Sequence, residues 1–454
     1  MRKVFFVFII FFIILPGGWF LVKGFEGQDP EIKLELPSQY LNKAYEISLS
    51  VSDTGKGLKN VRVSILKQNK EILLLSKRYP NPGVMGSGVF KDSFKIPVKF
   101  DGQKVTDGEA LIIIHVSDYS FRGWNKGNFS YIEKKVIIDS IPPKVSIMTR
   151  THNIKKGGAG LVVYRLFEDK IKSGVMIDDN FFPGFSGMFS DKDVYASFIG
   201  LGHNQGPGAK IAVVAQDSAG NTTRKGFHYY IGNKKFKKDT LNISQNFLDK
   251  NIPNFNLPED SGYNGSDKSL LEKFIYINST IREKNCSTIL KKSLKTQNKL
   301  MWKGKFLRLP GSARRASFGD RRIYKHNGKE ISRAVHLGVD LASVKKSRVS
   351  AANSGRIIAA ENIGIFGNSI IIDHGFGLCT LYSHLSSFEV EEGANVKKGD
   401  TIGRTGVTGL VGGDHLHFGV FVNNIFVNPV EWWDQKWVEN NIISKIDSIR
   451  QQLK

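Results

Sequence analysis

The chain has 454 residues, and 41% of them are hydrophobic, a share typical of a globular protein. This length excludes a single hydrophobic core, because domains usually contain roughly 100–200 residues, so we expect about two to four domains in series. The 65 Lys and Arg residues outnumber the 42 Asp and Glu residues, which gives a formal net charge of +23. The excess favours an anionic partner such as a nucleic acid, a phospholipid surface or an acidic envelope polymer, without choosing between them.

The N-terminus begins with Met1-Arg2-Lys3, and an uncharged apolar stretch follows from Val4 to Val22. At ~1.5 Å per helical residue, this stretch is long enough to cross a hydrocarbon core of ~30 Å. We therefore predict that residues 1–23 form a single-pass anchor in the inner membrane, with the bulk of the chain in the periplasm or outside the cell. A cleaved signal peptide is the alternative, although no A-x-A-like cleavage site follows the apolar residues.

Two segments after the anchor alternate apolar and polar residues, as half-buried β-strands do. We predict two immunoglobulin-like β-sandwich modules over residues 30–142 and 143–232, divided at Pro142-Pro143 because proline cannot join a central ladder. An apolar strand, Asp, a turn and Gly-Asn occur once in each module, ending at Asn128 and at Asn221. Both modules resemble immunoglobulin-like domains of bacterial envelope proteins, which implies a spacer role or contacts with envelope protein partners.

Helical spacing follows in residues 233–304, which we predict to be a helical connector. Ser269 and Glu272 fit a capping box at the start of its main helix. The apolar positions behind that box keep helical spacing and are Leu270, Leu271, Phe274, Ile277 and Ile281.

Short strands return over residues 305–434, where we predict a separate β domain. Residues 435–454 are predicted to be a C-terminal docking helix, because their apolar residues share one helical face. These residues are Ile442, Ile446, Ile449 and Leu453. The two cysteines of the chain, Cys286 and Cys379, could form a disulfide outside the cytoplasm, and two buried free thiols are the simpler interpretation.

Three segments of the β domain carry histidines at positions where a strand directs side chains to one face. If "AVHLGVDLA" is a β-strand, His336 and Asp340 lie on one face, and a strand at "DHLHFGV" does the same for His415 and His417. The segment "CTLYSHLSS" supplies His384. Any one of these histidines alone would more often be an ordinary core or surface residue. Since a buried imidazole without a partner is costly, three matching segments within about eighty residues favour a metal site.

Zinc is the natural occupant of such a site. Two histidines and one carboxylate would supply three protein ligands at ~2.0–2.2 Å and leave a fourth position for water, which is the arrangement of a catalytic site. The segments offer four histidines and one aspartate, so two histidines remain for other work.

The motifs H-x-x-x-D at His336–Asp340, Y-x-H-L at Tyr382–Leu385 and H-L-H-F at His415–Phe418 resemble those of lysostaphin/LytM-type zinc endopeptidases, which cut peptidoglycan peptides. The resemblance covers about Phe306 to Asp434, under a third of the chain. The surrounding stretches that agree are "SFGDRR" at 317–322, "GNSIIIDHG" at 367–375, "VKKGDTIGRTGVTG" at 396–409 and "NPVEWW" at 428–433.

The resemblance implies that His336, Asp340 and His417 hold one Zn²⁺, with His384 and His415 beside it as acid/base or transition-state groups. It also implies a two-layer antiparallel β fold with the zinc in a groove.

This chain departs from the family pattern around H-L-H. It has Val411-Gly412-Gly413-Asp414 in place of a Ser-Thr-Gly-Pro run and Gly419 in place of a glutamate, and it lacks the usual Pro and Gly after Asp340. These departures affect the groove wall more than the metal, and therefore bear on substrate preference.

We predict an envelope-anchored zinc metalloendopeptidase that hydrolyses peptide bonds in peptidoglycan stem peptides or cross-links with metal-activated water. His384 or His415 would accept the water proton, and the other would assist the oxyanion or the leaving amine; the sequence does not assign the two roles. Asp373, Asp414 and Asn368 are candidates for orienting the ligands, although a turn or strand-end role is more ordinary for each.

The alternative function is a catalytically silent scaffold that binds the wall or activates other wall hydrolases. Nucleic-acid binding is excluded as a prediction, because the lysines are spread over all modules and the chain is expected outside the cytoplasm.

Overall fold

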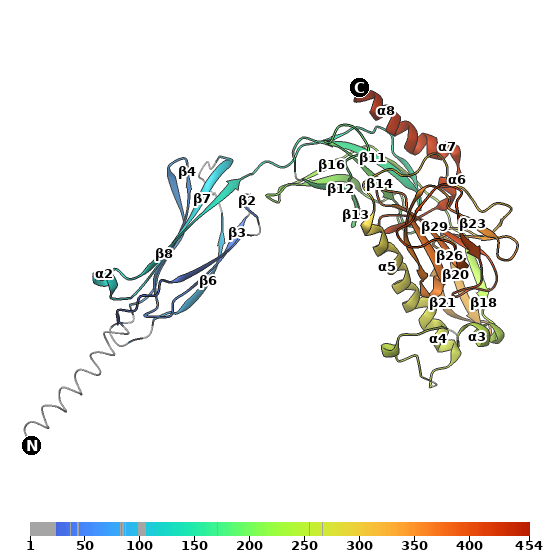
Figure 1. Cartoon of the computed structure of the whole chain (residues 1–454), viewed down its shortest axis with the longest axis horizontal. Helices are drawn as coiled ribbons and strands as arrows, with labels where there is room; N and C mark the ends of the chain where they lie inside the picture. The colour runs from blue at the N-terminus through green and yellow to red at the C-terminus, as the bar shows by residue number, and fades with distance from the viewer. Residues whose placement is uncertain are drawn as a thin grey trace, which may run out of the picture. The chain divides into compact units, whose positions relative to one another are not determined.

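The computed structural model describes residues 24–454 except 37, 43–44, 82, 84–85, 87, 99–105, 170, 254 and 266. The predicted anchor, residues 1–23, lies outside this part of the chain. None of the helices within the described part is long and apolar enough to cross a membrane. The chain divides into two compact units, both mainly β (Figure 1), of which one contains the residues up to Pro143 with Gln216–Thr222 and the other contains Lys144–Ala215 with Thr223–Lys454.

The first unit is a β-sandwich. Its elements are β1 Glu31–Glu35, β2 Tyr40–Leu41, β3 Glu46–Ser52, β4 Leu58–Lys67, β5 Lys70–Arg78, β6 Lys91–Pro97, β7 Gly108–Asp118, the short turn α2 Arg122–Asn125 and β8 Phe129–Ile138. One sheet has the order β1-β3-β6 and the other β2-β8-β7-β4-β5. Alternate residues of both sheets, such as Ile47 of β3 and Ile112 of β7, are fully buried in one core. The sandwich matches the predicted alternation, and its kinship with immunoglobulin-like domains stays a prediction.

Apart from Gln216–Thr222, the second β module belongs to the same compact unit as the C-terminal region. Its strands are β9 Val145–Ile147, β10 Asn153–Lys155, β11 Ala159–Leu166, β12 Lys172–Ile177, β13 Asn180–Pro183, β14 Val194–Gly200, β15 Ile211–Gln216, β16 Thr222–Gly226 and β17 Tyr230–Gly232. They form sheets of order β14-β11-β9, β13-β12-β15-β16 and β10-β17. Phe198 of β14 lies 6.3 Å from Trp302 and 6.4 Å from Trp432 between ring centroids, so the module shares a core with residues far along the chain.

The connector begins with a strand and continues as helices. Its elements are β18 Lys238–Asn242, α3 Gln245–Asn251, η1 Glu259–Ser261, α4 Leu270–Tyr276, the π-helical turn η2 Ile277–Ile281, α5 Arg282–Lys292 and η3 Ser293–Lys295. The capping box forms as predicted, since Glu272 N donates to Ser269 Oγ at 3.2 Å and Ser269 N donates to Glu272 Oε2 at 2.9 Å. The apolar face is buried at Phe274 and Ile277.

The prediction that residues 233–304 are helical is wrong at the start of the connector, because Leu241 and Asn242 belong to β18. This strand adds in parallel to β20 (Arg321–His326), with Leu241 opposite Tyr324. Helix α3 starts only after Ser244, whose Oγ accepts a hydrogen bond from Phe247 N at 3.2 Å. Pairing with a distant strand thus overrides the local helical spacing.

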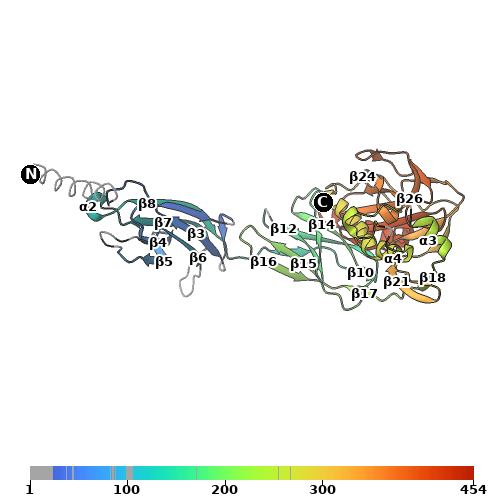
Figure 2. The ribbon, with the colours of Figure 1, turned by 90° about the horizontal axis from the view of Figure 1, so that it is seen from below.

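The C-terminal domain is built on a large antiparallel sheet. Its elements are β19 Ala313–Ala316, β20, β21 Lys329–Val335, β22 Val339–Ala342, β23 Arg348–Ser350, β24 Gly355–Asn362, η4 Gly364–Phe366, β25 Asn368–Asp373, β26 Leu378–Phe388, β27 Asn395–Val396, β28 Thr401–Thr405, β29 Leu416–Val422 and β30 Ile425–Val427. The main path of the sheet is β19-β22-β29-β26-β25-β24-β27. A smaller sheet, β18-β20-β21, lies beside α3 and α4 (Figure 1, Figure 2).

The tail forms α6 Pro429–Trp433, α7 Gln435–Val438, the π-helical turn η5 Glu439–Ile443 and α8 Ser444–Gln452. The face predicted from the spacing is the buried one, with Ile442, Ile446 and Ile449 at most 2% exposed. Lys445 Nζ donates to the carbonyl of Leu161 in β11 at 3.2 Å. The tail therefore docks on the second β module.

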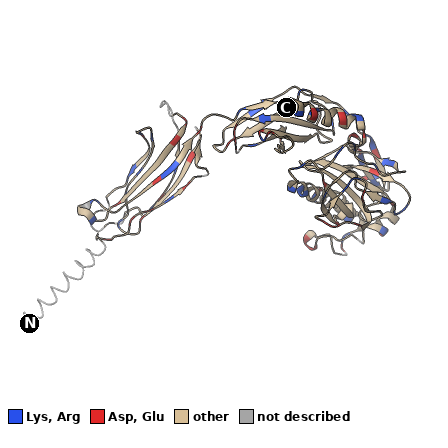
Figure 3. Ribbon diagram, turned by 45° about the horizontal axis from the view of Figure 1, so that its top comes forward, with Lys and Arg blue, Asp and Glu red and all other residues tan. Residues whose placement is uncertain are grey.

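The charges and the thiols show no further organisation. Basic and acidic residues are interspersed over both units (Figure 3), which agrees with lysines spread over all modules. Cys286 and Cys379 are free thiols, so the disulfide left open by the sequence does not form.

The docking of α8 predicts the effect of Ile446→Ala. Removing the buried side chain should lower the free energy of unfolding of the second unit by about 2–5 kcal/mol, through lost burial and a residual cavity. Denaturant unfolding followed by tryptophan fluorescence measures this, because Trp302, Trp432, Trp433 and Trp437 all lie in this unit. Ser448→Ala, on the exposed face of the same helix, should change it by less than about 0.5 kcal/mol.

Candidate active site

Three neighbouring strands bring the predicted site residues together. Asp340 of β22 lies directly opposite His417 of β29, and antiparallel partners in register share a face. On the far side of β29, His417 is paired with Ser383 of β26, and His384 follows it in the chain. His336 lies in the link between β21 and β22. The predicted strand over "AVHLGVDLA" is therefore correct for Asp340 and wrong for His336.

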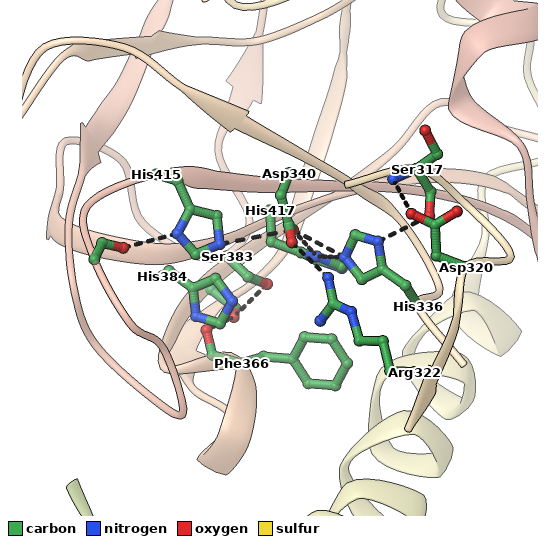
Figure 4. A network of polar contacts seen from close by, with 12 residues as sticks. Ser317, Asp320, Arg322, His336, Asp340, Phe366, Ser383, His384, His415 and His417 are labelled. Atoms are coloured by element: carbon green, nitrogen blue, oxygen red, sulfur yellow. Dashed lines mark hydrogen bonds and ion pairs between the residues drawn. The ribbon is translucent and has the colours of Figure 1, made fainter. Parts of the chain in front are cut away.

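Three metal-type donor atoms converge at the centre of the site (Figure 4). His336 Nε2 lies 2.9 Å from Asp340 Oδ1 and 3.0 Å from His417 Nδ1, and His417 Nδ1 lies 2.9 Å from Asp340 Oδ1. All three residues are buried. His415 Nε2 lies 3.6 Å from Asp340 Oδ1, and the rings of His384 and His415 are 4.9 Å apart between centroids.

Backbone carbonyls fix which nitrogen of each histidine faces the centre. His336 Nδ1 lies 3.0 Å from Ser317 O, His384 Nδ1 lies 2.9 Å from Thr408 O, and His415 Nδ1 lies 2.8 Å from Gly413 O. Because a carbonyl oxygen can only accept a hydrogen bond, each Nδ1 carries the hydrogen when the ring is neutral, and each Nε2 presents a lone pair. Such outer partners orient metal ligands.

This arrangement fits a divalent cation. Two ligands of one tetrahedral zinc ion lie ~3.4 Å apart, close to the separations of the three donor atoms here. When the His336 ring is neutral and its Nδ1 donates to Ser317 O, its Nε2 lone pair faces the Asp340 oxygen, which is repulsive unless a cation lies between them. His417 Nε2, on the outer side of its ring, is buried without a hydrogen-bond partner in the described part of the chain.

Burial and mutual contacts set the charges of the site. Burial lowers the pKa of His417 to about 4 and, with help from His415 and His417, lowers the pKa of His384 well below its ordinary value. Burial opposes ionisation of Asp340, but His336, His415 and His417 outweigh it and hold its pKa well below the usual range. In His415, burial is outweighed by Asp340, which raises the pKa. At neutral pH Asp340 is ionised and His417 is neutral, the states that metal ligands require.

Arg322 is a site residue that sequence reasoning missed. Its guanidinium lies 2.9 Å from Asp340 Oδ2, and the side chains are 17% and 12% exposed. Arg322 thus binds Asp340 Oδ2, the carboxylate oxygen that does not face the histidines. "SFGDRR" contains two adjacent arginines whose strand faces differ, and only the pairing of β20 with β21 decides that Arg322 points inward.

Two backbone features admit the imidazoles. His384 has φ of +64°, which is costly for a residue with a side chain, and it lies between Tyr382 and Leu385, where the pairing of β26 with β25 shifts its register. This irregularity breaks the strand alternation and re-aims the ring. At Gly338, a Cβ atom would lie 2.6 Å from His417 Nε2 and 2.6 Å from Phe418 O, so only glycine leaves room for the His417 ring.

The three residues considered as orienting groups lie outside the cluster of donor atoms. Asp373 accepts hydrogen bonds from Thr296 Oγ1 and Gln297 N at 2.7 Å each, and thereby anchors the end of the connector. Asp414 accepts from Thr405 Oγ1 at 2.6 Å. Asn368 N donates to Thr408 Oγ1 at 2.9 Å, and so supports the His384 partner indirectly.

The site opens into a cavity of about 310 Å³ whose walls come from both the β domain and the connector. Val411 and Gly412, which depart from the family pattern, line it. The connector residues that line the same cavity are Leu241, Asn242, Ile243, Phe247, Phe274 and Arg282. The connector is therefore part of the wall of the site cavity.

Residues 334–429 match Peptidase family M23. The C-terminal domain is therefore an M23 peptidase domain, as the resemblance to lysostaphin/LytM-type enzymes predicted. The match contains His336, Asp340, His384, His415 and His417.

Two curated relatives show how far the likeness extends. The DD-carboxypeptidase/endopeptidase Mpg of Neisseria meningitidis is 42% identical over 96 residues, which are 21% of this chain and 22% of that protein. The peptidoglycan DD-endopeptidase ShyC of Vibrio cholerae is 36% identical over 135 residues, 29% of this chain and 30% of that protein. The chain thus spans less than a third of the length of these relatives.

Among solved structures, the catalytic domain of lysostaphin from Staphylococcus simulans is 31% identical. That likeness covers 28% of this chain and 94% of the lysostaphin domain, with a TM-score of 0.24.

The close approach at Gly338 predicts that Gly338→Ala weakens zinc binding by about 10–100-fold, because overpacking of about 1–3 kcal/mol displaces the His417 ring. Zinc content after dialysis against a competing chelator measures the loss. Gly412→Ala is the matched control, since a Cβ atom there meets nothing within 4 Å, and it should retain zinc like the parent chain. Equal zinc retention in both variants would contradict the role of the ring position.

Proposed function

We propose that the chain is a zinc metalloendopeptidase that hydrolyses peptide bonds in peptidoglycan stem peptides or cross-links. The observation that carries the proposal is the convergence of His336 Nε2, Asp340 Oδ1 and His417 Nδ1, all within 3.0 Å of one another, with His384 and His415 beside them. Three ligands and two further imidazoles are the parts that metal-assisted hydrolysis of an amide requires.

His336, Asp340 and His417 would hold the ion. When bound, zinc lowers the pKa of a coordinated water toward ~7 and polarises the scissile carbonyl. Arg322 keeps Asp340 in one orientation through its second oxygen, and Ser317 O does the same for His336. The ligands are therefore pre-positioned before substrate arrives.

His384 and His415 differ in their protonation, which suggests a division of labour. Burial holds His384 neutral, and its Nδ1 donates to Thr408 O, so its Nε2 is free to accept a proton. Despite burial, Asp340 raises the pKa of His415, whose Nε2 faces that carboxylate, so His415 is the better placed of the two to carry a proton. We assign His384 as the proton acceptor, and His415 as the donor to the oxyanion or the leaving amine.

The substrate assignment rests on the relatives and on charge. The names of two relatives describe peptidases acting on D,D-bonds, one of them in peptidoglycan. The net charge of +23 suits a partly anionic wall polymer. The apolar stretch from Val4 to Val22 supports an inner-membrane anchor that would place the domain in the periplasm or outside the cell.

The assignment predicts that His384→Ala and His415→Ala each retain about one zinc per chain and lose turnover of purified sacculi by about 10²–10⁴-fold. Zinc content and released peptides measure the two properties separately. Masses of the products from cross-linked and uncross-linked muropeptides identify the bond: monomers from dimers indicate an endopeptidase, and shortened stems indicate a carboxypeptidase. Full turnover in either variant would exclude that histidine from the reaction.

A second candidate function is a latent or silent scaffold, and the lining of the cavity favours it. Phe247 of α3 lines both the site cavity and a neighbouring cavity of about 800 Å³, so the connector lies where an extended peptide would enter. Zinc bound without any released peptide would support this alternative over the enzyme.

If the connector restricts entry of the substrate, Phe247→Ala should raise turnover by about 5–30-fold. The loss of about one or two kcal/mol of packing energy would shift the equilibrium between a closed and an open position of the connector by that factor. Leu248, which is 1% exposed, keeps α3 docked in this variant. Asp249→Asn, on the exposed side of α3, should leave turnover unchanged. Unaltered turnover in Phe247→Ala would mean that the connector is a fixed groove wall.

A further inference from the structure

The first unit contains a cluster of carboxylates that the proposed function does not use. Glu26 precedes β1, Asp53 follows β3 and Asp118 ends β7. One carboxylate oxygen of each lies within 4.8 Å of the other two. Asp53 is 5% exposed and Asp118 is fully buried. Two buried carboxylates and one half-buried carboxylate from distant parts of the chain are thus held together, which is costly unless positive charge is supplied.

One oxygen of the cluster has no partner. Asp53 Oδ2 accepts hydrogen bonds from Gly55 N at 3.0 Å and Gly57 N at 2.6 Å, whereas Asp53 Oδ1 is buried and has no hydrogen-bond partner in the described part of the chain. Gly55 lies directly against Glu26, because a Cβ atom on Gly55 would be 2.2 Å from the Glu26 carboxyl carbon, so only glycine fits beside that carboxylate. A buried carboxylate oxygen without a hydrogen-bond donor indicates a missing ligand.

The amide of Asn128 is surrounded by more oxygen atoms than it can satisfy. Asn128 Nδ2 lies 3.1 Å from Glu26 O, 3.0 Å from Glu26 Oε1, 3.2 Å from Gln28 O and 2.9 Å from Asp118 Oδ2. An amide nitrogen has two hydrogens, so two of these four oxygens receive none. Rotation of the amide would bring Oδ1 into the same cage as another oxygen ligand.

The second β module offers an internal comparison. Asp217 Oδ1 accepts from Ala219 N and Asn221 N, as Asp118 Oδ1 accepts from Ser120 N and Asn128 N. Asn221 Nδ2 has two oxygen neighbours, Asp217 Oδ2 and Asp139 O, and two hydrogens for them. Within the described chain, no trio of metal-type side chains includes Asp217. In the second module, the hydrogens of the asparagine amide therefore match its oxygen neighbours in number. In the first module, the oxygen neighbours outnumber the hydrogens.

We infer that Glu26, Asp53 and Asp118, with backbone carbonyls beside them, form a Ca²⁺ site in the first β module. All the donors are hard oxygens, and they come from carboxylates, from carbonyls of Glu26 and Gln28, and from the Asn128 amide. Ca²⁺ takes six to eight such ligands in irregular geometry, whereas zinc prefers nitrogen and sulfur and Mg²⁺ requires a near-ideal octahedron.

The charges of the cluster agree with this site. Burial, with Asp118 and Asp53 as neighbours, raises the pKa of Glu26 to about 7, and burial with Asp118 raises the pKa of Asp53. Mutual repulsion of this kind is relieved either by a proton or by a cation. Ca²⁺ would tie the segment before β1 to the β3–β4 loop and to the end of β7, and so stiffen this end of the module.

Calcium binding by the full chain tests the site. The protein is stripped of metal, reloaded with one equivalent of Zn²⁺ to fill the C-terminal site, and dialysed against ~1 mM Ca²⁺, the range in which extracellular modules bind it. We expect about one bound Ca²⁺ per chain in the parent protein and in Asp217→Asn. Glu26→Gln, which keeps the shape and removes a charge, should weaken binding at least tenfold, and Asp53→Asn should do the same.

Thermal unfolding supplies the second readout. Ca²⁺ should raise the midpoint for the first unit by about 5 °C in the parent protein and by much less in Glu26→Gln, whose midpoint without Ca²⁺ should be no lower than that of the parent because one repelling charge is gone. The inference is overturned if the parent chain binds no Ca²⁺ at ~1 mM, if Glu26→Gln binds it as well as the parent, if Asp217→Asn loses it equally, or if Mg²⁺ displaces it at equal concentration. These readouts do not depend on peptidase activity.

Discussion

The opposition of Asp340 and His417 across two antiparallel strands is the contact on which the C-terminal site depends. It places a carboxylate and an imidazole on one buried face, and His336 joins them from the link before the strand. A slip of one residue between β22 and β29 would send one of the two side chains to the opposite face of the sheet. Two backbone features also help to bring the imidazoles into the site. Gly338 and the left-handed backbone of His384 each make space for an imidazole that regular strand geometry would exclude.

The sequence predicted the parts of this site that depend on alternation and motif spacing. His336, Asp340, His384, His415 and His417 all meet in the structure, and the M23 match agrees with the resemblance. The contributions that local sequence patterns do not determine come from pairings between distant segments. Arg322 faces Asp340 only because β20 pairs with β21, and the connector reaches the cavity only because β18 adds to β20. Neither pairing leaves a local periodic signal, since both depend on the partner strand.

In the first β module, too, contacts between distant segments leave no signal in the local sequence. The recurrence of Asp, a turn and Gly-Asn was visible in the sequence, and it forms similar hydrogen-bonded turns at Asp118 and Asp217. The difference between the two turns arises from Glu26 and Asp53, which lie 92 and 65 residues before Asp118 and belong to no recognisable motif with it. A repeated motif thus predicted a shared local structure, and the tertiary neighbours decided its chemistry.

Phe198 packs against Trp302 and Trp432, so the second β module and the peptidase domain are held together by aromatic contacts. A fragment cut near residue 300 would keep Trp432 and α8 and lose Phe198, which packs beside Trp432, and Leu161, whose carbonyl accepts a hydrogen bond from Lys445 of α8. Such a fragment would be prone to aggregate for reasons unrelated to its chemistry. The smallest excised piece that keeps every covering surface begins near Lys144, at the start of the second compact unit.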